Sequence, residues 1–233
     1  MEKILTCGLV CPFWTSFRNP STVNVHVTYP FPPPTTLYGM LNAARGMPQD
    51  WQDDQDEWQI SLVIESSGKL IQTFSKIMKI YEEKRKKAEA AKDKYGKGVF
   101  QKTTVMRQKM IGVEYTAYFK APEERLIEGY QALLSPHWPL YLGESDDLVD
   151  VISPRIIEVE PMPVKRIHSI IPELEQGCRL VKVPNRFVKQ GKSWHVQQQL
   201  YSIPPEKDGI QLSKPKLAYT IEERNIVFNG NSW

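Results

Sequence analysis

Short runs of alternating apolar and polar residues dominate the first part of the chain, a pattern typical of β-strands. Residues 22–28 show it and place three valines on one face, while residues 4–10 form a strand-sized apolar run. The proline-rich run at 29–34 is neither helical nor inside a sheet, because each proline lacks an amide donor and restricts the residue before it. We therefore expect two strands followed by an extended segment.

A helix is predicted next, over residues 37–45, because its apolar positions recur at helical spacing. Thr35 or Thr36 is placed to cap its first turn, and Gly46 is placed to end it. The acidic stretch at 47–57 is expected to be a surface loop.

Two more strands are predicted at residues 60–65 and 70–80. The residues between them, Ser-Ser-Gly-Lys at 66–69, favour a hairpin-like turn. The order up to this point is strand, strand, helix, strand, strand.

The regular pattern breaks after residue 80. Residues 82–94 are charged nearly all round a helix, so they cannot bury an apolar stripe and should project into solvent. Alternation returns at 105–119, which predicts a returning strand. We interpret residues 80–109 as a basic arm inserted into a hairpin.

A second helix is predicted from 121 to 134, with proline and acidic residues in its first turn and a strand following at 155–159. Its expected buried residues are Leu126, Ile127, Tyr130, Leu133 and Leu134. The chain then fits an α+β fold with a strand-helix-strand-strand-helix-strand core, the ferredoxin-like (RRM-like) arrangement.

We assign residues 1–160 to this core, including the arm, and residues 161–233 to a strand-rich C-terminal section packed on it. Apolar stretches are strand-sized, far below the roughly 20 residues that span a bilayer, and the first residues do not resemble a signal peptide. We therefore expect a cytoplasmic protein with no membrane contact.

The charged residues are distributed unevenly along the chain. The net charge is only +3, yet residues 76–109 hold twelve Lys or Arg and four Asp or Glu. A basic segment on a mildly acidic body favours a polyanionic partner. A solvated lysine-rich helix is the alternative interpretation of the same pattern.

Motifs that define common enzyme classes are absent from the sequence, including phosphate-binding glycine loops and metal-binding histidine pairs. Cys7 and Cys11 are expected to be buried thiols. No catalytic residue, cofactor or metal is therefore assigned. One weaker enzyme hypothesis stays open, in which His26, Tyr29 and a nearby lysine cleave RNA without a metal.

Two segments resemble a known family. Residues 29–44, YPFPPPTTLYGMLNAA, are similar to the Pro-Pro-x-Thr/Ser-x-x-Gly-x-Leu-x-Ala-Ala signature of the fifth CRISPR-associated (Cas) protein family. Residues 142–149, LGESDDLV, are similar to a second block of that family. The resemblance covers about two thirds of the chain; the part after Pro161 shows no matching motif.

This resemblance implies an RNA-binding core of the repeat-associated (RAMP) superfamily with a thumb-like arm. It implies a non-catalytic subunit of a type I CRISPR Cascade complex, which binds the 5′ handle of the guide RNA (crRNA) in antiviral defence. The partners implied are the crRNA and the backbone and large subunits, with target DNA contacted only indirectly. One subtype of the family processes precursor crRNA, and a purely protein-bridging role is a third hypothesis.

Single-stranded RNA is bound by cations at its phosphates and by aromatic rings under its bases. The aromatic loop before residue 20 offers both kinds of group, the helix start offers amide and hydroxyl donors, and the arm offers cations. The RNA-binding residues that we predict are Trp14, Phe17, Arg18, Asn19, Thr35, Thr36, Lys102, Arg107 and Lys109.

Overall fold

The computed structural model describes residues 1–80, 100–191, 193–205 and 208–229 of the 233-residue chain. Within these ranges, the side chains at 77–80 and 100–103 lie outside the description. Among the described residues, no helix is both long enough and apolar enough to cross a membrane.

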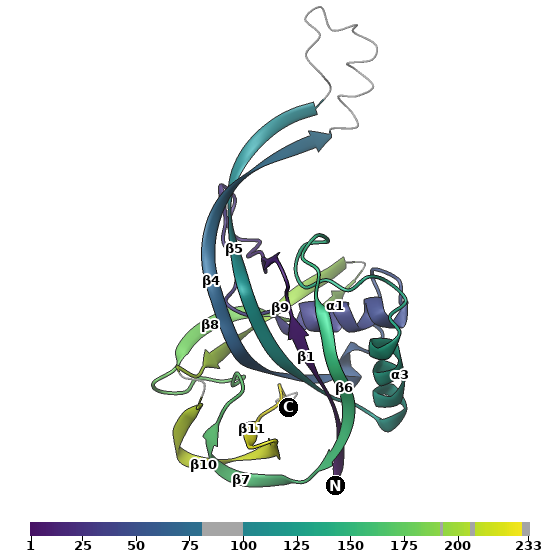
Figure 1. The fold of residues 1–233 in the computed structure, drawn as a ribbon, viewed down its shortest axis with the longest axis vertical. Helices are drawn as coiled ribbons and strands as arrows, with labels where there is room; N and C mark the ends of the chain where they lie inside the picture. The colour runs from purple at the N-terminus through teal and green to yellow at the C-terminus, as the bar shows by residue number, and fades with distance from the viewer. Residues whose placement is uncertain (81–99, 192, 206–207, 230–233) are drawn as a thin grey trace, which may run out of the picture.

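The main sheet is built from four long strands with two helices on one of its faces (Figure 1). Its spatial order is β4-β5-β1-β6, and every neighbouring pair is antiparallel. In chain order the elements are β1 (Glu2–Val10), α1 (Pro34–Arg45), β4 (Gln59–Ile80), β5 (Phe100–Lys120), α3 (Glu123–Leu134) and β6 (Asp150–Val159). The predicted series of strand, helix, strand, strand, helix and strand is therefore present.

Strand β1 is buried on both faces, which explains its nearly continuous apolar sequence. Leu5 and Leu9 belong to the core cluster that also contains Leu41 of α1 and Leu126 of α3. Ile4 points the other way, into a cluster with C-terminal residues such as Tyr219. The same short strand thus holds the helices on one side and the C-terminal section on the other.

The C-terminal section consists of two separate sheets. Strands β7 (Pro161–Ile167), β10 (Ile210–Ile221) and β11 (Arg224–Ile226) form one, in the order β11-β10-β7. Strands β8 (Arg179–Gln190) and β9 (Ser193–Ile203) form a two-stranded hairpin. Figure 1 shows the three-stranded sheet at the end of the molecule opposite the arm.

The predicted turn at residues 66–69 is wrong. Strand β4 runs unbroken from Gln59 to Ile80 because β5 pairs with it along this whole length. The register shifts between Ile64 and Ser66, and Gly68 adopts a φ of 61°. A side chain at Gly68 would place a Cβ 2.3 Å from the carbonyl oxygen of Ile111, so the glycine permits close strand approach at a bulge rather than a reversal.

The predicted strand at 22–28 is also largely wrong. Only β3 (Val25–His26) forms there, beside β5, and Val23 is 77% exposed because no sheet covers its face. A second short strand, β2 (Trp14–Thr15), pairs with β5 between β3 and β1.

The helices begin and bury their side chains somewhat differently from the prediction. Neither Thr35 nor Thr36 caps α1, because Pro34 is its first residue and Pro33 precedes it without a side-chain cap. Gly46 ends α1 in the left-handed region, as predicted, with a φ of 72°. On α3, Ile127 and Leu134 are exposed, contrary to the prediction that both are buried.

The paired strands extend away from the body as an arm, which we define as residues 69–80 with 100–111 (Figure 1). The arm begins at the bulge, at residue 69, whereas the sequence predicted its start at residue 80. The start is earlier because β4 and β5 remain paired past the edge of the body. The predicted helix at 82–94 lies outside the described residues.

Candidate nucleic-acid interface

A groove of about 890 Å³ runs over the outward side of α1. Its floor is the helix surface from Thr35 to Ala43, and its walls are the loop after α1, the loop at 138–145 and Phe187 of β8. The lining residues are Thr35, Thr36, Tyr38, Gly39, Met40, Asn42, Ala43, Gly46, Met47, Pro48, Gln49, Trp51, Gln52, Trp138, Pro139, Tyr141, Gly143, Ser145 and Phe187. Residues from both family-like segments therefore meet at one surface.

Small side chains keep the floor of the groove open. Gly39 lies in the middle of α1, and a Cβ added there would meet no atom within 4 Å. Thr35 and Thr36 lie half-buried at the start of the helix, and both residues line the groove. The backbone N–H of Thr36 donates to the carbonyl of Pro33 at 2.8 Å, so this amide is not one of the free donors that we expected at the helix start.

Aromatic side chains form the walls. Trp138 and Tyr141 are exposed, and they come from the loop between α3 and β6. Trp51, from the loop after α1, also lines the groove, and its indole N–H donates to Asp54 at 3.1 Å. Sequence reasoning missed these residues and Phe187. Trp138 is placed four residues before the second family-like segment, which is the one feature of the sequence that could have pointed to it.

A buried ion pair fixes the helix and the loop beside it. Asp54, 3% exposed, accepts hydrogen bonds from Arg45 at 2.6 Å and from the Tyr38 hydroxyl at 2.5 Å. Arg45 also donates to Glu128 of α3 at 3.0 Å. Burial alone would raise the pKa of Asp54, but the Arg45 guanidinium and Tyr38 hydroxyl outweigh it and hold that pKa below its usual value. The acidic loop at 47–57 is thus tied to the core, and it holds Trp51 in place.

The second family-like segment, residues 142–149, connects to the loop at 14–16 through hydrogen bonds at the base of the arm. Asp147, almost fully buried, accepts the backbone N–H of Ser16 at 2.8 Å and of Glu144 at 3.1 Å. Gly143 adopts a φ of 103°, and a Cβ there would lie 2.3 Å from the carbonyl oxygen of Ser16. The segment therefore presents Gly143 and Ser145 to the groove while its acidic residues hold the loop at 14–16.

Two of the predicted arm cations pair with this segment. Arg107 donates to Glu144 at 2.8 Å, and the Lys109 ammonium lies 2.7 Å from Asp147 and 3.5 Å from Glu144. Lys109 is only 5% exposed, so its predicted contact with RNA is corrected to a buried ion pair. The side chain of Lys102 lies outside the part of the chain that the structure describes.

The aromatic loop divides between core and surface. Phe17 is 2% exposed and packs against Tyr115 with ring centres 6.2 Å apart, so its predicted stacking role is corrected to core packing. Trp14 is half exposed, and the Lys109 ammonium lies 5.6 Å from its ring centre. Arg18 is exposed, while Asn19 accepts hydrogen bonds from Ser21 in a local turn.

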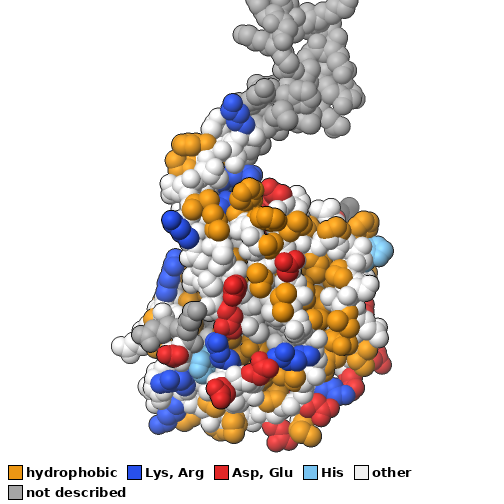
Figure 2. All heavy atoms as spheres, viewed as in Figure 1, with side chains coloured by type: hydrophobic (Ala, Val, Ile, Leu, Met, Phe, Trp, Pro, Cys, Tyr) orange, Lys and Arg blue, Asp and Glu red, His pale blue; other side chains and the backbone are white. Residues whose placement is uncertain are grey.

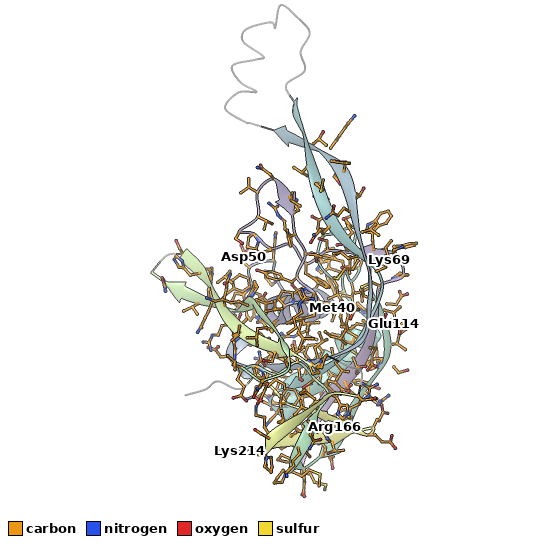
Figure 3. The ribbon with its side chains drawn as sticks, turned by 90° about the vertical axis from the view of Figure 1, so that its left-hand side faces the viewer. Met40, Asp50, Lys69, Glu114, Arg166 and Lys214 are labelled. Carbon is orange, nitrogen blue, oxygen red and sulfur yellow. The ribbon has the colours of Figure 1, made fainter. Side chains whose placement is uncertain are left out.

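Charged and hydrophobic side chains gather in different parts of the surface near the arm. Figure 2 shows Lys and Arg side chains along one edge of the described arm, and hydrophobic side chains where the arm meets the body. Among the exposed cations are Arg18 and Lys69, the latter at the base of the arm in Figure 3. The described surface therefore carries an uncharged aromatic groove and, outside it, exposed cations that include Arg18 and Lys69.

Comparisons with known proteins point in one direction. A family model described as "CRISPR-associated protein (Cas_Cas5)" matches residues 8–214. A solved structure described as a CRISPR RNA-guided surveillance complex shares the fold, with a TM-score of 0.57 at 18% identity, covering 92% of this chain and 91% of that chain.

Two further structures are similar at lower scores. One described as a Cas protein has a TM-score of 0.49 at 15% identity, over 88% of this chain and 99% of that chain. A CRISPR protein from Archaeoglobus fulgidus has a TM-score of 0.46 at 15% identity, over 96% and 97%. No curated protein matches the sequence.

Proposed function

Because the chain belongs to the Cas5 family of CRISPR-associated proteins, we propose that it is a subunit of a type I Cascade surveillance complex that binds the 5′ handle of the guide RNA. It would sit beside the backbone and large subunits of that complex. The observation that carries the RNA-binding role is the groove on α1, where both family-like segments meet.

The chemistry of the groove suits bases rather than phosphates. None of the described residues that line it carries a charge, and five of them are aromatic. Tyr38 is buried, and the other four are Trp51, Trp138, Tyr141 and Phe187. Unstacked bases gain about 1–3 kcal/mol each by stacking on such rings. The backbone of the same strand would then pass the cations outside the groove, Arg18 and Lys69.

The architecture supports an RNA-binding core. The strand order β4-β5-β1-β6, with α1 and α3 on one face, is the order expected of a ferredoxin-like (RRM-like) core, and we classify it so. On this classification β4 and β5 extend beyond the core as the thumb-like arm.

We further propose that this subunit holds RNA without cutting it. His26 and Tyr29, the acid–base candidates, are each 5% exposed, and neither lines the groove. Labelled precursor RNA incubated with the chain and a chelator is expected to remain intact. A discrete cut that disappears in the His26→Ala variant would favour the endoribonuclease instead.

The proposed function predicts salt-dependent binding of a 5′-handle RNA in which Lys69 takes part. Each phosphate contact on a single strand adds about 0.7 to the slope of log affinity against log salt. Lys69→Glu is therefore expected to weaken binding and to flatten that slope, as measured by fluorescence anisotropy across a salt series.

Lys214→Glu is the matched control, because it makes the same charge change at the end of the molecule away from the arm (Figure 3). It should bind like the native chain. Equal weakening by both variants would reduce the effect to net charge, and no binding by the native chain would reject the proposed function.

A further inference from the structure

The β8–β9 hairpin is a second concentration of positive charge that the arm does not account for. From residue 179 to 203 the sequence holds five Lys or Arg and no Asp or Glu. The net charge of the whole chain is only +3, so this composition departs strongly from that of the body. An acid-free, two-stranded projection is suited to a polyanionic partner.

The hairpin is fastened beside the groove. The Gln55 side chain accepts the backbone N–H of Phe187 at 2.8 Å and donates to its carbonyl at 2.9 Å. Arg186 reinforces this attachment by pairing with Asp56 at 3.0 Å. Figure 3 shows the hairpin projecting on the side of the molecule where Asp50, in the loop after α1, also lies.

One face of the hairpin continues the groove wall. The register pairs Phe187 with Val196 and Lys189 with Trp194, and residues two apart on a strand share a face. Phe187 lines the groove, so these four side chains lie on the face that extends from it. Trp194 is 42% exposed, and the Lys189 ammonium lies 5.8 Å from its ring centre.

This combination selects a nucleic acid over a protein. An exposed indole beside a lysine offers stacking to a base and a cation to the adjoining phosphate. Gln198 of β9, two residues from Val196 on the same face, adds a neutral donor and acceptor, and residues 179–203 include no carboxylate that would repel a phosphate. An acidic partner without aromatic rings would have no group to stack on the exposed indole of Trp194.

We propose that the face of the hairpin formed by Phe187, Lys189, Trp194 and Val196 binds the nucleotides that follow those held in the groove. The bound species is single-stranded RNA, continuous with the strand on α1. This inference rests on the proposed function and extends it, because the guide RNA would be held along two consecutive surfaces.

The test uses the full chain and a set of RNAs that carry the 5′ handle and grow by one nucleotide at either end. Native affinity is expected to rise when the RNA becomes long enough to reach the hairpin. Trp194→Ala should lower the affinity for long RNAs by about tenfold, the loss of one stacked base, and leave the shortest RNA unaffected. Lys189→Glu should act in the same way and reduce the salt slope.

Gln197→Ala is the matched control, because Gln197 is exposed on the opposite face of the same hairpin and should bind every RNA like the native chain. A photoreactive uridine in the added segment should crosslink to a peptide that contains Trp194. Equal losses for short and long RNAs, or no loss for any, would overturn the inference.

Two other outcomes separate this inference from the proposed function. Normal RNA binding combined with loss of a partner subunit in the Trp194→Ala chain would assign the hairpin to a protein contact and overturn the inference alone. Failure of the native chain to bind any RNA would overturn both.

Discussion

Replacing Gly39 by tryptophan is expected to remove most of the affinity for a 5′-handle RNA without destabilising the chain. The indole would enter the open space above α1, where a Cβ meets no neighbouring atom, and would fill the groove. Each base excluded from its stacking position costs about 1–3 kcal/mol, so we expect a loss of about tenfold or more. Fluorescence anisotropy with labelled RNA measures the loss, and thermal unfolding checks the fold.

Gly39→Ala provides the control for this experiment. A methyl group occupies little of the groove, while replacing a glycine inside a helix should stabilise α1 by about 0.5–1 kcal/mol. The alanine chain should therefore be slightly more stable than the native chain and bind RNA nearly as well. If the tryptophan chain binds with native affinity, the RNA does not occupy the groove.

Replacing Lys109 by methionine is expected to cost about 3–5 kcal/mol of folding free energy, because it leaves the buried Asp147 carboxylate without its ammonium partner. The loss should appear as a lower urea midpoint at neutral pH. The double variant Lys109→Met/Asp147→Asn should regain part of it, since neither charge remains and the amide oxygen can still accept the Ser16 N–H.

The pH dependence of the single variant tests the same pair. Burial raises the pKa of Asp147, while Lys109 and two backbone N–H groups oppose the rise. Removing Lys109 should raise the folded-state pKa further above the unfolded value, so the ionised form destabilises the fold at neutral pH. This penalty should disappear as the pH falls through the raised pKa toward about 4, the ordinary carboxyl range. A deficit that does not change with pH would contradict the pairing.

The roles of Arg107 and Lys109 could not be predicted correctly from the sequence. Charge counting identified the basic segment, and alternation correctly placed Arg107 and Lys109 on one face of a strand. Neither pattern indicates what covers that face. Glu144 and Asp147 come from a loop more than 30 residues away. Their contacts place Lys109 in a buried ion pair and Arg107 in a partly exposed one.

The groove could be predicted only in part for a similar reason. Of its floor, only Thr35 and Thr36 were predicted as site residues, because they lie in a segment with a recognisable family pattern. Its walls come from three separate segments, and Phe187 reaches it through backbone hydrogen bonds to Gln55. Such pairing over long sequence separations leaves no periodicity in either segment.

The sequence by itself determined the order of the main strands and helices, the end of α1 at Gly46 and the family, because these depend on local spacing, on backbone-restricting residues and on contiguous motifs. The tertiary structure alone decided that residues 66–69 form a bulge, that Phe17 and Lys109 are buried, and that α1, the 138–145 loop and β8 share a groove. Those outcomes depend on which distant segment supplies the neighbouring strand, the opposing charge or the covering side chain.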